Sequence, residues 1–424
     1  MTEQASPAAS SESVLIVGAG HAAGEMAVAL RVNQYVGDIT IAGDEPHLPY
    51  QRPPLSKAFL SGEISHERLH VKAPATYDNA NIRCLPNTRV TAIDRVAKTV
   101  TTADGRTLGY GKLVLATGGR PRLLTLPDER IHQAPNLHYL RTIGHVDALR
   151  EQFVAGNRLV IIGGGYIGLE VAAVARKKGI DVTVLEAMPR VLQRVTAPEL
   201  SEFYARVHTE AGVKILVNTA LTGFEFDAAG KITTVLAGDG LKIPADVVIV
   251  GIGLIPNVEL AEAAGLAIDN GIAVDEYGRT SDPDILAIGD CSSHPSAYAG
   301  RRIRLESVPS ALEQARSAAA LLVGQLKPYN AVPWFWSDQY DLKLQMVGLN
   351  QGYDTVVLRG SPAARNFLAL YLKDGALLAA DSVSRPQEFM VAKKLVGDRI
   401  KVDPAVLADE TKPLKDLLAT APAA

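Results

Sequence analysis

Cysteine is scarce in this chain of 424 residues, which contains only Cys84 and Cys291. The two lie far apart in the sequence, and neither belongs to a CxxC or CxxxxC pair. The sequence therefore has no disulfide framework, and it lacks the adjacent thiols that a disulfide-exchanging enzyme requires. We interpret Cys291 as a small buried residue and not as a reactive thiol.

Long apolar runs and an excess of charge are also missing. No apolar run reaches the ~18 residues that a membrane span needs. Residues 1–13, MTEQASPAASSES, have neither a basic nor an apolar region, so we expect a short disordered tail there and not a signal peptide. The net charge of −3, with 21% charged residues, argues against nucleic-acid binding and against an acidic disordered protein. We expect a soluble, cytoplasmic protein that contains two or three domains and no metal site.

The most informative stretch is 159–186, LVIIGGGYIGLEVAAVARKKGIDVTVLE. An apolar strand pattern runs into a glycine turn, a helical pattern follows, and a β-branched run stops at Glu186. The strand, turn, helix, strand and acid are the parts of a dinucleotide-binding unit. Such a unit needs Gly163 for the tight turn, Gly165 for the approach of a pyrophosphate, and Gly168 for close helix packing. Glu186 is placed to accept hydrogen bonds from an adenosine ribose.

A second unit begins at residues 14–17 with VLIVGAGHAAGEMAVALR. Gly18, Gly20 and Ala23 occupy the three positions of its turn, and Glu25 matches Glu170 of the later unit. This is an internal duplication of about thirty residues, and it implies two dinucleotides. FAD with a nicotinamide partner is the economical pairing, because a flavin accepts a hydride and can release single electrons.

Alternating strand and helix patterns predict an α/β fold with parallel sheets, and strand-like patches after Pro328 predict a separate α+β domain. The predicted buried strand 245–257 contains a glycine turn, and we assign Gly251 and Gly253 to the NAD site. The fold class is thus two Rossmann-like dinucleotide-binding domains, for FAD and NAD, and a C-terminal α+β domain. The expected boundaries are 14–117 for the first part of the FAD domain, 118–246 for the NAD domain, 247–327 for the second FAD part, and 328–424 for the C-terminal domain.

Taken together, several motifs resemble the putidaredoxin-reductase type of FAD-dependent ferredoxin reductase. They are GxGxxA, RPPLSK (52–57), LATGGRPR (115–122), GGGYIGLE, GIGLIPN (251–257), GDC (289–291) and PWFWSDQY (333–340). They follow in order over essentially the whole chain, and RPPLSK with PWFWSDQY is the specific part. The resemblance implies an FAD domain divided by an NAD domain, a C-terminal domain that covers the flavin, and electron transfer from NADH through FAD to a [2Fe-2S] ferredoxin. That ferredoxin serves a cytochrome P450 or a ring-hydroxylating oxygenase.

The resemblance also implies roles for particular residues. Lys57 is expected beside the flavin ring, paired with Glu170, although a helix dipole alone could account for an acid near a helix start. Asp290 is expected to bind the ribityl chain, and an N-cap role is the alternative or an addition. Either Asp44 or Glu45 holds the FAD ribose, and the sequence leaves this choice open. The remaining residues expected to line the FAD site are Ala22, Val90, Arg141 and Val308.

Trp334 and Trp336 are the only tryptophans, and their spacing puts both on one face of a strand. They either pack between domains or place an indole, which we assign to Trp336, beside the flavin. For the ferredoxin, the basic run 393–401 suggests a docking patch, although such a run can also be a solvated helix face. The residues proposed for the patch are Lys393, Lys394, Lys415 and Arg316.

The prediction is therefore an NADH-dependent ferredoxin reductase. A rubredoxin reductase, a direct NADH oxidase and an NADH-sensing flavoprotein that acts through a partner are the alternatives. A disulfide reductase is a further alternative, and the missing thiol pair makes it the weakest one.

Overall fold

The computed structural model describes residues 13–238 and 240–420, so the expected tail lies outside the described residues except for Ser13. Among the described residues, no helix is both long and apolar enough to cross a membrane. The chain divides into two compact units. The first unit comprises Met1–Arg52, His66–Arg120 and Ile255–Pro333, and the second comprises Pro53–Ser65, Pro121–Leu254 and Trp334–Ala424.

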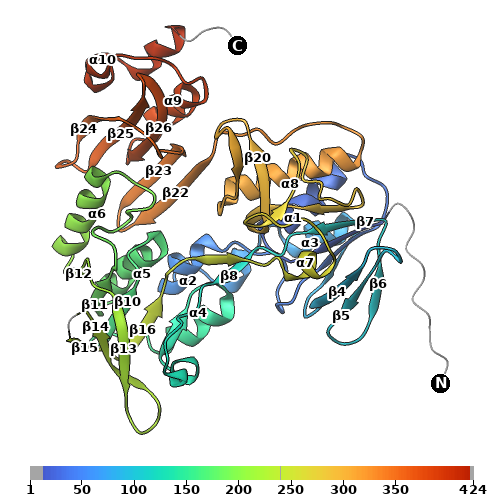
Figure 1. Ribbon diagram of the computed structural model, residues 1–424, viewed down its shortest axis with the longest axis horizontal. Coiled ribbons are helices and arrows are strands. Elements are labelled where there is room, and N and C mark those ends of the chain that lie inside the picture. The colour runs from blue at the N-terminus through green and yellow to red at the C-terminus, as the bar shows by residue number, and fades with distance from the viewer. Residues whose placement is uncertain (1–12, 239, 421–424) are drawn as a thin grey trace. The chain divides into compact units, whose positions relative to one another are not determined.

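The first unit is built on a parallel sheet of five strands in the order β19-β7-β1-β2-β3. Apart from β3, these strands are mainly apolar and buried, as expected for a parallel sheet that is covered on both faces. Helices α1 and α8 pack together on this sheet, and their small alanine side chains allow the close approach (Figure 1). The bounds of the sheet strands and of these helices are β1 Val14–Val17, α1 His21–Val32, β2 Ile39–Ala42, β3 Ile82–Leu85, β7 Lys112–Leu115, β19 Ile285–Ala287 and α8 Val308–Leu322.

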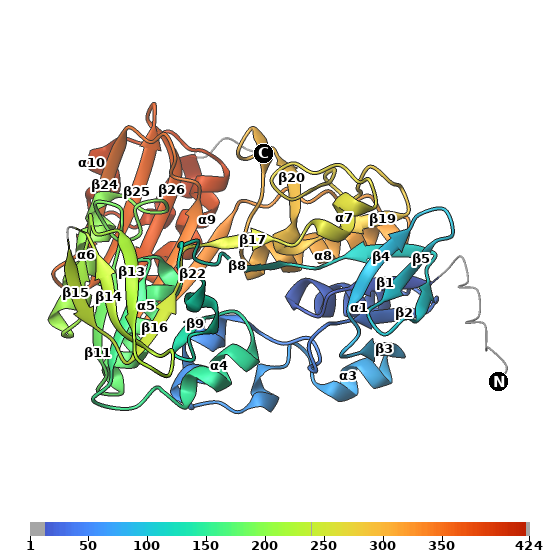
Figure 2. The ribbon, with the colours of Figure 1, turned by 60° about the horizontal axis from the view of Figure 1, so that its bottom comes forward.

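Shorter elements complete the first unit, including an antiparallel meander of β4, β5 and β6, of which Figure 2 labels β4 and β5. The bounds are η2 His66–Leu69, α3 Pro74–Asn79, β4 Val90–Asp94, β5 Thr99–Thr102, β6 Thr107–Gly109, α7 Glu259–Ala263, β18 Ile272–Ala273, η4 Gly289–Cys291, β20 Ser292–Ser296 and β21 Arg301–Ile303. Two further strands, β8 (Gly119–Pro121) and β17 (Leu254–Pro256), span the points where the chain passes between units.

The second unit contains another parallel sheet of five strands, in the order β12-β11-β10-β16-β9, and a second meander of β13, β14 and β15. The elements of this part are η1 Pro53–Ser56, α2 Ala58–Ser61, η3 Glu129–Gln133, β9 Leu137–Tyr139, α4 Ile143–Arg150, β10 Arg158–Ile162, α5 Tyr166–Lys177, β11 Asp181–Leu185, α6 Pro198–Glu210, β12 Lys214–Leu216, β13 Leu221–Phe226, β14 Ile232–Ala237, β15 Leu241–Pro244 and β16 Val247–Val250.

The C-terminal residues of the second unit form an antiparallel sheet in the order β22-β23-β26-β25-β24. Figure 1 shows this orange and red sheet beside the green helix α6, and the two share one apolar core with α5. The expected α+β character of this segment is confirmed. Its elements are β22 Trp334–Gln339, β23 Leu342–Gly348, β24 Thr355–Ser361, β25 Asn366–Lys373, β26 Ala376–Val383, α9 Pro386–Gly397, α10 Pro404–Ala408 and η5 Leu414–Thr420.

The duplication is longer than the thirty residues expected from the sequence. From β1 to β7 and from β10 to β16, each unit repeats strand, helix, two parallel strands, a three-stranded meander and a returning parallel strand. The meanders carry no shared motif, so the sequence did not reveal this part of the repeat. The expected boundary at residue 247 falls directly before β16, which pairs with β10 in the sheet of the second unit.

Candidate functional site

The glycine turn of the second unit connects β10 to α5. Gly163 has a φ of +107°, and a Cβ there would lie 2.5 Å from the carbonyl oxygen of Gly251. A Cβ on Gly168 would lie 2.4 Å from the Gly163 oxygen, so the protein's own packing requires both glycines. A Cβ on Gly165, in contrast, would meet no protein atom within 4 Å. Packing does not explain Gly165, whereas a pyrophosphate at the start of α5 does.

The turn of the first unit has the same geometry. Gly18 has a φ of +110°, and a Cβ there would lie 2.2 Å from the carbonyl oxygen of Ala116. A Cβ on Gly20 would meet no protein atom within 4 Å, and Gly20 is the N-cap of α1. Ala23, at the third position of the turn, is buried. Each unit therefore holds a helix start and a glycine cradle that fit a dinucleotide phosphate.

Glu186 follows β11 and is fixed by the backbone. Its two carboxylate oxygens accept hydrogen bonds from the N–H groups of Gly164 and Met188, each at 2.8 Å. The nearby cation Arg190 is engaged elsewhere, because its guanidinium donates to the Ser201 hydroxyl and to the carbonyl of Gln193. The carboxylate is thus held at the end of its strand, beside the glycine turn.

Two glycines after β16 complete this edge of the second unit. The N–H of Gly251 donates to the carbonyl of Ile162 at 2.8 Å, which places Gly251 directly against the Gly163 turn. Gly253 has a φ of +119°, in the region that favours glycine, and a Cβ there would meet no protein atom within 4 Å.

Asp44 and Glu45 differ in their surroundings. The Glu45 carboxylate forms an ion pair with Arg52 at 2.8 Å and accepts a hydrogen bond from the Tyr50 hydroxyl at 2.6 Å. Asp44, which comes two residues after the end of β2, is exposed. The carboxylate of Glu45 is therefore occupied by the protein itself.

Asp290 is the middle residue of the short helix η4, whose N-cap is Ile288. The alternative N-cap role for Asp290 is therefore wrong. The preceding Gly289 has a φ of +78°, and a Cβ on it would lie 3.1 Å from the Cβ of Ala22 in α1. This close approach brings Asp290 beside the start of α1, the end of the helix that favours an anion.

The other residues expected at the FAD site are distributed over both units. In the first unit, Val90 is buried on β4 and Val308 is the first residue of α8. Arg141 belongs to the second unit, where it directly precedes Thr142, the N-cap of α4.

Lys57 and Glu170 form an ion pair within the second unit. The Lys57 Nζ lies 2.7 Å from Glu170 Oε2, and the two side chains are 19% and 4% exposed. The hydroxyls of Ser56 and Ser337 donate to the same carboxylate at 2.5 and 2.6 Å. Glu170 lies beyond the first turn of α5, so the helix dipole does not account for it. The carboxylate can be buried because three donors compensate its charge.

Trp334 and Trp336 share one face of β22, as their spacing predicted. Their ring centroids lie 5.7 Å apart, and Trp334 also contacts Phe389 of α9. The opposite face of β22 carries Phe335, whose ring lies 5.2 Å from that of Tyr166 on α5. Trp334 therefore packs within the C-terminal sheet domain, and Trp336 stacks beside it.

The two cysteines cannot form a redox pair. Cys84 lies on β3, and Cys291 is the last residue of η4, four residues after the end of β19. The strands β3 and β19 are the opposite edges of one sheet. Both thiols are free. Burial raises the pKa of Cys84 to about 11, with Asp78 adding to the effect, and burial also raises the pKa of Cys291. A raised pKa opposes formation of the nucleophilic thiolate.

The four basic residues proposed for docking differ in their contacts. Lys394 and Lys415 are exposed, whereas the Lys393 Nζ lies 4.8 Å above the Trp334 ring. Arg316 belongs to the first unit, where its Nε lies 2.7 Å from the carboxylate of Glu25.

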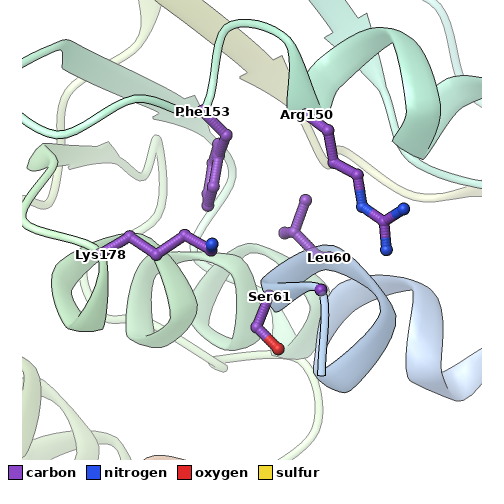
Figure 3. Close-up of a pocket in the computed structure, with 6 residues that line it drawn as sticks. Leu60, Ser61, Arg150, Phe153 and Lys178 are labelled. Carbon is purple, nitrogen blue, oxygen red and sulfur yellow. The ribbon is translucent and has the colours of Figure 1, made fainter. Parts of the chain in front are cut away.

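A cavity of about 250 Å³ lies at the end of α2 opposite Lys57, lined by Leu60, Ser61, Gly62, Arg150, Phe153 and Lys178 (Figure 3). Arg150, one of the two cationic residues that line the cavity, is bound to another part of the protein. Its guanidinium lies 3.9 Å from the centroid of the Phe59 ring and also donates a hydrogen bond to the Phe59 carbonyl. The cavity is not part of the candidate site. Among the described residues, no cluster of histidine, cysteine or acidic side chains is arranged to hold a metal ion.

Reasoning from the sequence missed several polar residues around these groups. Tyr50 and Arg52 hold Glu45, and Ser56 and Ser337 hold Glu170. All four lie in or beside the quoted motifs, so the signal was present. Their partners are distant in the sequence or separated by a turn, and only the folded chain identifies them.

This chain has two dinucleotide-binding units, no usable thiol pair, and a shielded ion pair between Lys57 of the RPPLSK motif and Glu170. These features define a flavin- and pyridine-nucleotide-dependent oxidoreductase. The sequence profile of the pyridine nucleotide-disulphide oxidoreductase family matches residues 12–315, and that of the reductase C-terminal domain matches residues 334–418. The chain belongs to the pyridine nucleotide-disulphide oxidoreductase family.

Individual relatives agree with this membership. The chain is 50% identical to putidaredoxin reductase CamA of Pseudomonas putida, over 97% of this chain and 98% of that protein. It is 42% identical to a ferredoxin–NAD(P)(+) reductase of Sphingomonas sp., over 97% of this chain and 98% of that protein. A crystal structure of a covalent putidaredoxin reductase–putidaredoxin complex superimposes with a TM-score of 0.94 at 50% identity, covering 97% of this chain and 99% of that one.

These matches confirm the expected fold class, the resemblance to putidaredoxin reductase, and an oxidoreductase that uses FAD and a pyridine nucleotide. The family name includes disulphide chemistry, which the positions of Cys84 and Cys291 do not support in this member.

Proposed function

We propose that this chain is an NADH-dependent ferredoxin reductase. It transfers electrons from NADH through FAD to a [2Fe-2S] ferredoxin that serves a cytochrome P450 or a ring-hydroxylating oxygenase. The names of the relatives support this acceptor, since they include putidaredoxin reductase and ferredoxin–NAD(P)(+) reductase.

One structural observation carries the proposal: two complete dinucleotide cradles occur in a chain whose two cysteines lie at opposite edges of a sheet. The chain can bind an electron donor and a flavin, but it has no dithiol of its own to reduce. Electrons that enter must therefore leave to an external acceptor. When bound, FAD accepts a hydride and can release the two electrons one at a time, which suits a one-electron iron–sulfur acceptor.

In the proposed arrangement, Gly18, Gly20 and the N-terminus of α1 hold the FAD pyrophosphate. Asp44 is the better candidate for the FAD ribose, because Arg52 and Tyr50 occupy Glu45. Asp290 holds the ribityl chain beside Ala22. Residues Val90, Arg141 and Val308 complete the proposed lining.

The turn formed by Gly163, Gly165 and Gly168 holds NADH, with Gly251 and Gly253 at its rim. Glu186 supports NADH over NADPH, because a carboxylate accepts from a ribose 2′-hydroxyl but repels a 2′-phosphate. Arg190 supplies no compensating charge in this geometry, since Ser201 and Gln193 engage its guanidinium.

Near the flavin ring, Lys57 provides the positive charge and Glu170 fixes its position. Neither acts as a nucleophile, since positioning of donor and acceptor supplies most of the catalysis in hydride transfer. We propose that Trp336 borders the face that the nicotinamide or the ferredoxin approaches. Lys393, Lys394 and Lys415 of the second unit form the proposed docking patch, and Arg316 of the first unit is a separate candidate for contact with the ferredoxin.

For the domains, we propose an FAD domain divided around the NAD domain, followed by the C-terminal domain from about residue 328. The strand pairing supports moving the end of the NAD domain from 246 to beyond β16, because β16 is part of the NAD sheet.

The test is anaerobic reduction by NADH followed by turnover with defined acceptors. We expect a yellow protein with about one FAD per chain that NADH bleaches, and rapid reduction of a [2Fe-2S] ferredoxin. Rubredoxin, oxygen and a low-molecular-weight disulfide serve as competing acceptors. Faster turnover with any of these three than with the ferredoxin would contradict the proposal. A long-lived reduced complex that passes electrons neither to the ferredoxin nor to any of these three would also contradict it.

A further inference from the structure

A line of buried hydrogen bonds extends from the Lys57–Glu170 ion pair to the surface-facing turn after β22. Glu170 Oε1 lies 2.6 Å from the Ser337 hydroxyl, and the Ser337 Oγ lies 3.2 Å from Gln339 Nε2. Gln339 Oε1 lies 2.8 Å from His208 Nε2, and His208 Nδ1 lies 3.2 Å from the Tyr340 hydroxyl. All of these residues belong to the second unit.

The geometry of β22 explains why this line exists. Side chains two apart on a strand point to the same face, so Ser337 and Gln339 point together toward the helices. Ser337 reaches Glu170 on α5, and Gln339 reaches His208 on α6. Figure 1 shows β22 near these two helices. Ser337, Gln339 and His208 are each at most 1% exposed, so water does not replace these contacts.

The charge of Glu170 sets the direction of every proton in the line. An ionised carboxylate only accepts, so the single Ser337 proton goes to Glu170. The Ser337 oxygen must then accept from the Gln339 amide nitrogen, which turns the amide oxygen toward His208. His208 must therefore carry its proton on Nε2, and Nδ1 accepts from Tyr340. Four donors in series all point toward one carboxylate.

His208 is suited to a neutral role in this line. Burial lowers its pKa to about 4, although the hydrogen bond to Gln339 acts in the opposite direction. The imidazole is thus neutral at physiological pH, and it offers one donor and one acceptor, as the line requires. An amide in the middle of the line conducts protons poorly, so the line orients groups and does not serve as a proton path.

We propose that His208 and Gln339 are positioning residues of the reductase: acting through Ser337, they hold the Glu170 carboxylate in the orientation that presents Lys57 to the flavin. This inference rests on the proposed function, because it takes from that function the place of Lys57 beside the flavin ring.

The first experiment tests coupling by the rate of flavin reduction by NADH in a stopped-flow instrument. We expect Gln339→Leu to slow this step about fivefold, as loss of one hydrogen bond to the neutral Ser337 hydroxyl predicts. His208→Leu should slow it about threefold, because the effect weakens along the line. His208→Gln should restore the rate, since its amide can donate to Gln339 from a similar position.

A double-mutant cycle separates positioning from folding. The Glu170→Gln variant lacks the charge that polarises the line. In this background, adding His208→Leu should not slow flavin reduction further, although the added substitution should still lower the melting temperature. The matched control is His138→Leu. His138 lies on β9, whereas His208 lies on α6, which leads into β12 at the opposite edge of the parallel sheet. It should leave the reduction rate and the flavin spectrum unchanged.

The second experiment does not depend on turnover. Nitrogen-15 NMR of labelled histidine should show His208 as the Nε2–H tautomer in wild type and as a mixture in Ser337→Ala, because Gln339 is then free to rotate. An Nδ1–H tautomer in wild type, or equal slowing by His208→Leu with and without Glu170, would overturn the inference. A wild type that NADH does not reduce would instead contradict the proposed function, and the tautomer would still decide whether the line is polarised.

Discussion

The two glycine turns of this protein share a backbone geometry, but the helices that follow them use equivalent glutamates differently. Glu25 on α1 binds two cations, Arg316 at 2.7 Å and Lys72 at 3.3 Å, whose side chains are 60% and 34% exposed. Glu170 on α5 binds Lys57 together with two serine hydroxyls, all well shielded from solvent.

The difference shows which features of a duplicated unit are constrained by its ligand and which by its neighbours. The turns are alike because steric contacts force glycine at Gly18 and Gly163. A Cβ on Gly20 or Gly165 would meet no protein atom within 4 Å, which is the space that the proposed phosphate sites require. A buried carboxylate needs a partner in both units, but any partner with suitable charge suffices. The first unit uses one exposed and one half-buried cation, and the second uses a shielded lysine together with two serine hydroxyls.

The largest expected effect comes from filling either cradle. Gly20→Val should abolish FAD binding, and Gly165→Val should retain FAD but abolish reduction by NADH, because each side chain occupies the space of a pyrophosphate. Both positions have extended backbone and no protein atom within 4 Å of a Cβ, so both variants should fold. Absorbance spectra before and after anaerobic NADH distinguish the two losses.

Gly18→Ala provides the contrasting control for this experiment. Its φ of +110° and the contact with Ala116 predict a poorly folded protein and not a folded protein without FAD. If Gly20→Val retains stoichiometric FAD, the assignment of the first cradle is wrong.

The second effect tests the two glutamates directly. Glu170→Gln should destabilise the protein by about 3 kcal/mol and slow reduction by NADH more than tenfold, as removal of one partner from a buried ion pair predicts. Glu25→Gln should cost about 1 kcal/mol, since Arg316 is exposed and Lys72 is only half-buried, and should leave the reduction rate within about twofold of wild type. Thermal unfolding and stopped-flow absorbance measure both quantities. Equal rate losses would remove the functional distinction between the two units.

A third effect concerns a buried acid in the second unit. Burial raises the pKa of Asp381 from 3.8 to about 7, although a hydrogen bond from Tyr371 acts to lower it. Between these values the folded protein holds a proton that the unfolded chain has lost. The free energy of unfolding therefore falls as the pH rises from about 4 to about 7, by about 4 kcal/mol, and stays low above that range.

Asp381→Asn removes this ionisation and keeps a group that can accept from Tyr371. Its stability relative to wild type should therefore rise between pH 5 and pH 8, as measured by denaturant unfolding. A constant difference across this range would mean that Asp381 does not titrate there.

Some features of the fold and of the candidate site could be predicted from the sequence alone, and others could not. The strands and helices around both turns followed from apolar periodicity. The steric need for glycine at Gly163 and Gly168 was predictable because such rules act locally. The meanders β4–β6 and β13–β15 were not foreseen, since short alternating strands give a weak pattern. The contacts of Glu170 with Ser337, and of Gln339 with His208, join residues more than a hundred positions apart. Packing of the C-terminal sheet on α5 and α6 creates them, and no local rule predicts it.

The fourth effect is on coenzyme selection. Wild type should prefer NADH over NADPH, and Glu186→Ala should reduce that preference by about tenfold, the equivalent of about 1.4 kcal/mol of lost repulsion and hydrogen bonding. Glu186 belongs to the second unit, whereas the proposed FAD cradle lies in the first unit, so the FAD content of this variant should not change. Steady-state kcat/KM values for both coenzymes test this. An unchanged ratio in the variant would show that another residue selects the coenzyme.

The smallest expected effect concerns docking of the ferredoxin. Lys393, Lys394 and Lys415 lie on α9 and η5, which pack against each other, and Asp416 beside Lys415 partly offsets their charge. Long-range attraction mainly raises the association rate and weakens with salt. The Lys393→Glu, Lys394→Glu, Lys415→Glu variant should therefore reduce a [2Fe-2S] ferredoxin severalfold more slowly at low ionic strength and nearly normally at high ionic strength.

Lys393 requires separate attention because it also contacts the Trp334 ring. The double variant Lys394→Glu, Lys415→Glu leaves that contact intact, so it isolates the effect of exposed charge. Lys214→Glu, an exposed lysine on β12 of the same unit, is the matched control and should behave as wild type. Ferricyanide turnover should be normal in every variant, because a small acceptor does not use the docking surface. If the double variant matches wild type at all salt concentrations while the triple variant does not, the contact between Lys393 and Trp334 is what matters, and the ferredoxin docks elsewhere.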